Sequence, residues 1–146
     1  MALFGSRADR SAEADVLEAE IERLDQLTLP ALAAEVMGKA FGPGAEWEDP
    51  EEEATVGGPN DGAGATVEMI TTAMAPDGST RAVDDRTRLR LQRLVAEGLQ
   101  ALEHASLVRA QMHTAMGGFD YTPTRLGRTV LAAGAVAEVV GGGETT

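Results

Sequence analysis

The chain has 146 residues, a formal net charge of −12 and a hydrophobic fraction of 43%, with few aromatic side chains. This length is typical of one compact domain. The absence of cysteine excludes disulfides, thiolate metal sites and cysteine nucleophiles. Neither the start of the chain nor its longest apolar stretch, 130–140, has the length of a signal peptide's apolar core or of a bilayer span. We therefore expect a cytoplasmic protein without membrane association.

The charge is distributed unevenly along the chain. Residues 1–80 carry 4 basic and 17 acidic side chains, whereas residues 81–128 carry 8 basic and 5 acidic ones. The overall acidity argues against a general nucleic-acid binder, since phosphate contacts need an excess of lysine and arginine. The mildly basic second half is the only part of the chain suited to a polyanion.

The first part of the chain predicts two helices. Residues 1–11 lack periodicity, so we expect them to be disordered and a helix to begin at Ala12 with Ser11 as its N-cap. The apolar positions of this helix recur three or four residues apart, at Leu17, Ile21 and Leu24. Thr28 followed by Pro30 then indicates the start of a second helix, because proline is tolerated in a first turn.

Residues 43–64 are rich in acidic side chains, glycine and proline, and they contain the only tryptophan, Trp47. Such a segment cannot bury enough apolar area to offset the entropy of ordering, so we expect a mobile acidic loop. Trp47 is either a docking motif for a basic partner or a side chain folded back onto an apolar patch, and we favour the second. For the same reason we expect residues 141–146 to form a disordered tail.

The second half of the chain predicts helices and one hairpin. A helix restarts at Thr66, and Asp84 or Asp85 caps the longest helix, whose apolar stripe contains Gly98. This glycine costs up to about 1 kcal/mol of helix propensity, and we expect it to allow a close helix contact. Two strands follow, at 108–112 and 119–122, joined by a Gly-Gly turn.

The segment 66–131 resembles the winged helix-turn-helix family on a short C-terminal pattern. Five residues carry it: Tyr121, Thr124, Gly127, Arg128 and Leu131. The chain departs from the family where Pro123 replaces a leucine, where Ser106 replaces a left-handed glycine and where the connection 74–84 is long. The resemblance implies a mostly α fold with a small β-hairpin, a winged-helix-like helical bundle formed by residues 12–140 as a single domain.

The resemblance also implies a DNA-binding surface, because the family presents its long helix to the major groove. The candidate DNA contacts are Arg86, Arg88, Arg90, Gln92 and Arg93 on that helix and Arg109 and Arg125 on the wing and at its base. Arginine suits both guanine edges and phosphates. The alternative is that these arginines lie on a solvated helix face and pair with acidic neighbours or with the acidic loop.

No residues in the sequence form a recognisable catalytic or metal-binding pattern. His104 and His113 lack the spacing of a metal site, and the glycine-rich run 57–64 lacks the lysine of a phosphate loop. We therefore expect no enzyme activity, no cofactor and no bound metal. The sequence favours a non-catalytic regulatory protein that binds DNA through the long helix and wing. The alternative is a protein-interaction adaptor that does not bind DNA, and a homodimer through the N-terminal or C-terminal helix is open in both cases.

Overall fold

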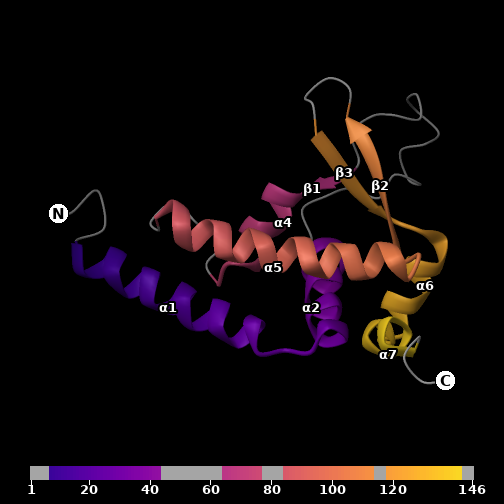
Figure 1. Cartoon of the computed structure of the whole chain (residues 1–146), viewed down its shortest axis with the longest axis horizontal. Coiled ribbons are helices and arrows are strands. Elements are labelled where there is room, and N and C mark those ends of the chain that lie inside the picture. The colour runs from indigo at the N-terminus through magenta and orange to yellow at the C-terminus, as the bar shows by residue number, and fades with distance from the viewer. Residues whose placement is uncertain (1–6, 44–63, 77–83, 114–117, 143–146) are drawn as a thin grey trace.

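The computed structural model describes residues 7–43, 64–76, 84–113 and 118–142 of the chain (Figure 1). This part is mostly helical and carries a small antiparallel sheet, as the sequence predicted. The elements are α1 (Arg7–Asp25), α2 (Leu29–Phe41), β1 (Ala65–Thr66), α4 (Val67–Met74), α5 (Asp85–His104), β2 (Val108–His113), β3 (Gly118–Pro123), α6 (Arg125–Ala132) and α7 (Val136–Gly141). No helix in these ranges combines the length and apolarity needed to cross a membrane.

Both ends of the helical region extend beyond the predicted limits. Helix α1 begins at Arg7, so the prediction of disorder is wrong for residues 7–11, and Ser11 lies inside the helix and is not its cap. Alanine and arginine in this segment favour helix without needing burial, which an apolar periodicity does not detect. Helix α7 likewise includes Gly141, within the predicted tail. The segments 1–6, 44–63 and 143–146, with most of the predicted acidic loop, lie outside the described residues.

Four helix starts share the same capping arrangement. In each, the side-chain oxygen of the residue before the helix accepts a backbone N–H three residues further on. The capping residues are Thr28, Thr66, Asp84 and Thr124. At α5 the structure selects Asp84 over Asp85: its Oδ1 accepts the N–H of Thr87 at 2.8 Å, and these hydrogen bonds hold the pKa of Asp84 below its usual 3.8.

The sheet has the strand order β1-β3-β2, with both pairs antiparallel. The predicted hairpin is confirmed, and each of its strands is one or two residues longer than the pattern indicated. Strand β1 was not predicted, because two residues are too few to show an alternating pattern. It approaches β3 closely, since a Cβ at Gly64 would lie 2.4 Å from the Cβ of Asp120.

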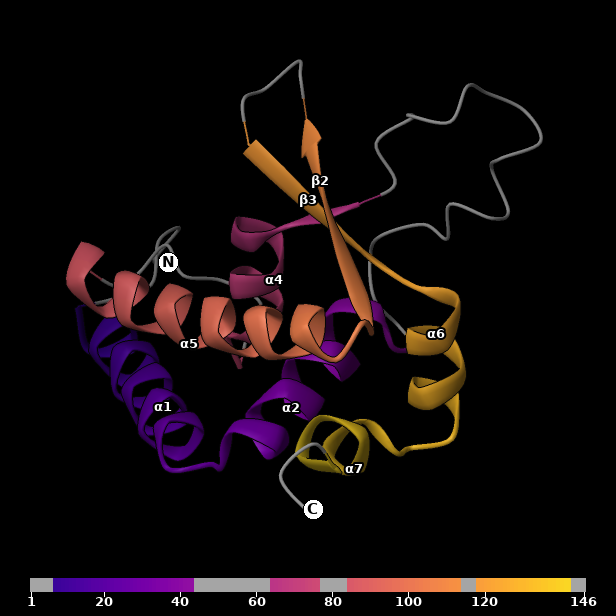
Figure 2. The ribbon, with the colours of Figure 1, turned by 45° about the vertical axis from the view of Figure 1, so that its right-hand side comes forward.

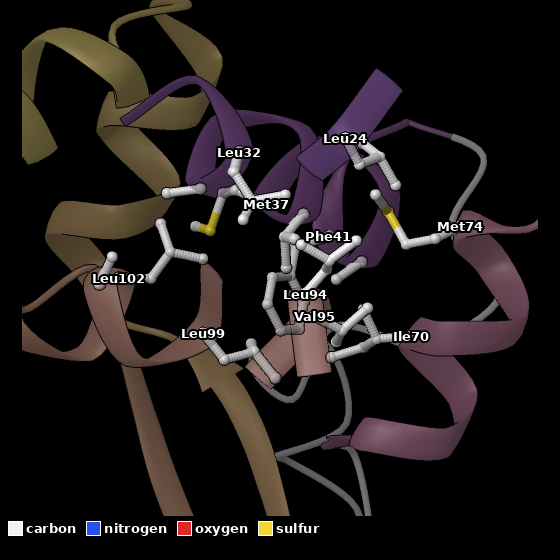
Figure 3. Packing of buried hydrophobic residues seen from close by; sticks show 14 of the residues in the cluster. Leu24, Leu32, Met37, Phe41, Ile70, Met74, Leu94, Val95, Leu99 and Leu102 are labelled. Carbon is white, nitrogen blue, oxygen red and sulfur yellow. The ribbon is translucent and has the colours of Figure 1, made fainter. Parts of the chain in front are cut away.

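The core lies where α2, α4 and α5 meet, and Figure 3 shows its side chains. Leu99 and Leu102 of α5 are almost fully buried there, together with Met37 of α2 and Ile70 of α4. A Cβ at Gly98 would lie 2.7 Å from Cγ2 of Val36, so this glycine does allow α2 and α5 to approach closely. The last turns of α1 add Leu17, Ile21 and Leu24 to the same cluster.

The hairpin is attached to the helices by a compact junction between α5 and α6. Leu107 is fully buried, and its carbonyl oxygen accepts the N–H of Thr124 at 3.0 Å. The Thr124 hydroxyl donates to the Ser106 carbonyl at 2.7 Å. Ser106 has a φ of 63°, so a serine adopts the left-handed conformation that glycine usually provides at such a turn. The base of the hairpin is therefore held against the start of α6.

Candidate functional site

The exposed side of α5 carries a row of three arginines, Arg86, Arg90 and Arg93. Their spacing of four and then three residues places them on one face of the helix, opposite the buried Leu91 and Val95. All three side chains are exposed. Figure 2 shows α5 lying across the molecule, with α1 below it and with α4 and the hairpin above it. The arginine row therefore lies on a helix that has one side open to solvent.

None of the three arginines of this row forms an ion pair with another described residue. By contrast, Arg88 is paired with Asp85 on its own helix, at 2.9 Å. Among the described residues, the expected pairing with acidic neighbours is therefore present for Arg88 and absent for the row, and residues 44–63 of the predicted acidic loop lie outside those residues. Unpaired guanidinium groups keep all their donors available for a phosphate or for a base edge.

The other predicted contact residues lie apart from the arginine row. Arg88 and the half-buried Gln92 are four residues apart and form a second row, separated from the first by the exposed Leu89. Arg109 on β2 and Arg125 on α6 are also exposed, but they belong to the base of the hairpin, beside the C-terminal end of α5 (Figure 1). The seven candidates thus form two neighbouring rows on α5 and two separate positions at the base of the hairpin. They do not make one continuous patch.

Helix α1 presents an acidic face that the sequence reasoning did not connect with the arginines. Glu18, Glu22 and Asp25 are spaced four and three residues apart and so share one side of α1. Asp25 lines the same cavity as Glu97, which continues the arginine row one turn beyond Arg93. The acidic side of α1 therefore lies on the side of α5 that carries the row. Only the contact between α1 and α5 reveals this arrangement.

The hairpin ends in an exposed apolar pair that the sequence reasoning also missed. Met112 and Phe119 are directly opposite each other across the strands and are 69% and 54% exposed. They continue the face of Val108 and Pro123, which is buried at the base of the hairpin. The hairpin extends away from the helices (Figure 1), and this pair lies near its far end. The alternation of side chains along a strand could have placed Met112 and Phe119 on the same face of the hairpin. It could not have predicted that this part of the face lies outside the core.

No protein-family model, curated protein or solved structure matches this chain. Within the described ranges, no three His, Asp or Glu side chains gather as metal ligands. The candidate site therefore rests on the geometry of α5 and its neighbours alone.

Proposed function

We propose that this protein is a non-catalytic regulator of the winged helix-turn-helix kind, which binds duplex DNA through the exposed arginine row of α5. The order of elements supports the fold assignment: helix α2, strand β1, helices α4 and α5, then the hairpin β2–β3 with β1 on its open edge. In helix-turn-helix proteins the second helix of the motif enters the major groove with its N-terminal residues at the bases. In this proposal α5, which follows α4, is that second helix.

The observation that carries the proposal is the exposed row Arg86, Arg90 and Arg93 in the N-terminal half of α5, which forms no ion pair with another described residue. The seven residue steps from Arg86 to Arg93 rise about 10 Å along the helix, which is about three base pairs along the duplex. The major groove is about 12 Å wide and admits one helix, and arginine binds guanine O6 and N7 with two hydrogen bonds. Arg109 and Arg125, near the other end of α5, would contact phosphates further along the duplex.

Fluorescence titration of a labelled random duplex of about 20 base pairs, at about 50 mM salt, tests the proposal. We expect Arg90→Ala/Arg93→Ala to weaken binding at least about tenfold and to reduce its dependence on salt, since phosphate contacts hold a random duplex. The control is Arg23→Ala/Lys39→Ala, which removes the same charge from exposed positions on α1 and α2. Because Arg23 pairs with Glu20 and with Glu35 of α2, a thermal melt first establishes that this variant is folded. No binding at tens of micromolar protein, or an equal loss in both double variants, would refute the proposal.

A second candidate function rests on the exposed pair Met112 and Phe119 and on the net charge of −12. In this alternative the chain is an interaction adaptor, which keeps the helical frame and contacts a basic protein partner through the hairpin. Pull-downs would compare wild type with Met112→Ser/Phe119→Ser and with Arg90→Ala/Arg93→Ala. The adaptor requires a partner that the hairpin variant loses and the arginine variant keeps. Failure to recover any partner above background argues against it.

A further inference from the structure

A cavity of about 770 Å³ lies on the side of the molecule away from the hairpin, where four helices converge. The end of α1, the start of α2, the C-terminal half of α5 and α7 each contribute residues to it. Figure 2 shows these segments brought together below α5. Sites for small organic ligands have volumes of about 300–1,000 Å³, so this cavity has the size of such a site.

The walls of the cavity are mainly aliphatic. Leu24, Leu32 and Leu94 form buried surface there, while Leu29 and Val139 at the edge are 49% and 37% exposed. Large aliphatic side chains at the mouth of a concave surface favour an apolar occupant, because their contact with water is unfavourable. The described residues that line the cavity include no Phe, Tyr or Trp, so shape and aliphatic contact would select the body of the ligand.

The polar groups of the cavity select the charge of the ligand. Asp25 from α1 and Glu97 from α5 contribute two carboxylates, beside Gln100 and His104, and no lysine or arginine lines the cavity in the described part. Two carboxylates on different helices, next to apolar walls, attract a cation whose remaining surface is apolar.

A second copy of the chain is a poorer occupant. It would bring the same net charge of −12 against the carboxylates at this edge, and like charges at close range oppose association. The cavity is concave, whereas an interface between identical copies through a twofold axis needs a self-complementary surface.

We propose that this cavity binds a small apolar organic cation, with its apolar body between α5 and α7 and its charge beside Asp25 and Glu97. The site uses the C-terminal half of α5 and none of the arginines of the proposed DNA contact. It therefore does not depend on DNA binding, and its test contains no DNA.

Isothermal titration calorimetry of the full chain with tetraphenylphosphonium tests the proposal, and tetraphenylborate is the matched probe of the same shape and opposite charge. We expect saturable 1:1 binding of the cation in the tens-of-micromolar range and at least about tenfold weaker binding of the anion. Asp25→Asn/Glu97→Gln should weaken the cation about tenfold and leave the anion unchanged or tighter, because only the charge of the site is altered.

Ala105→Trp fills the cavity from the end of α5 and should abolish binding of the cation. Ala96→Trp is the control, since Ala96 is exposed on the same helix and outside the cavity. Thermal melts establish that both variants fold, and sedimentation gives their oligomeric state. The proposal is overturned if the cation does not saturate, if the anion binds as tightly, or if Ala96→Trp loses binding equally. A wild-type dimer that Ala105→Trp dissociates, without binding of the cation, would show that the cavity is an interface between copies.

Discussion

The two halves of α5 show how one amphipathic helix produces two different surfaces. Up to Arg93 the exposed side is basic and open, whereas from Glu97 to His104 the same side is acidic to neutral and lines a cavity. The buried stripe behind both halves is continuous, from Leu91 to Leu102. The difference comes from the neighbours: the ends of α1 and α2 and the short α7 surround only the C-terminal half. A helical period thus determines which residues are outward, and the packing of other elements determines which outward residues stay accessible.

The largest expected effect is on the free energy of unfolding. It should be large for a buried side chain in the C-terminal half of α5 and small for an exposed charge in the N-terminal half. Leu102→Ala should lower the free energy of unfolding by about 2–5 kcal/mol, because the side chain is fully buried and leaves a cavity. Arg93→Ala should change it by less than about 0.5 kcal/mol, since its side chain is exposed and unpaired. Urea denaturation measures both. An equal loss in the two variants would mean that the arginine row serves the fold.

Gly98→Ala tests the close contact between α5 and α2. Alanine gains up to about 1 kcal/mol of helix propensity, but its Cβ would lie 2.7 Å from Cγ2 of the buried Val36, and overpacking costs about 1–3 kcal/mol. We expect a net loss of about 1 kcal/mol of stability. The control is Gly38→Ala in α2, where nothing lies within 4 Å of the added Cβ and alanine should stabilise.

Adding Val36→Ala to Gly98→Ala should recover the part of the loss that is due to the clash. A double-mutant cycle from denaturation curves measures this coupling. If the two substitutions prove additive, the separation of the two helices is not set by this contact.

The N-cap Asp84 makes the stability of the N-terminal half of α5 dependent on pH. Hydrogen bonds from Thr87 lower the pKa of Asp84 from its usual 3.8, so the folded state favours the carboxylate. The stabilisation is fully present above about pH 4 and is lost as the pH falls through the lower pKa of the folded state. The difference in melting temperature between wild type and Asp84→Ala should therefore shrink below pH 4. Asp85→Ala is the comparison, because Asp85 carries the same charge in the same turn and pairs with the exposed Arg88 without capping the helix. A difference for Asp84→Ala that persists to low pH, or one no larger than that for Asp85→Ala, would contradict the assignment.

The smallest expected effect concerns the acidic side of α1. If DNA approaches the arginine row, Glu18 and Glu22 repel its phosphates from the flank of α5. Glu18→Gln/Glu22→Gln should then strengthen DNA binding about two- to threefold at low salt, and the gain should fade as salt screens the repulsion. The control is Glu68→Gln/Glu138→Gln, which removes the same charge from exposed positions on α4 and α7. Fluorescence titration at two salt concentrations measures DNA binding by both variants. Equal gains would mean that the net charge of the protein matters and the position of Glu18 and Glu22 does not.

The sequence by itself determined those helices, caps and strands that interactions between residues close in the chain specify. The stripe of α5, the cap at Thr124 and the hairpin from Val108 could be predicted, because periodicity, capping and turn chemistry act within a few residues. It also placed Arg86, Arg90 and Arg93 on one face, since that follows from helical spacing alone.

Only the tertiary structure decided what those faces meet. It added β1, brought Asp25 and Glu97 to one cavity and left Met112 and Phe119 exposed. Each of these depends on contacts between residues far apart in the chain, or on neighbours that fail to reach a surface. Local patterns carry no information on such distances, because the same amphipathic helix can be covered or left open by whatever packs beside it.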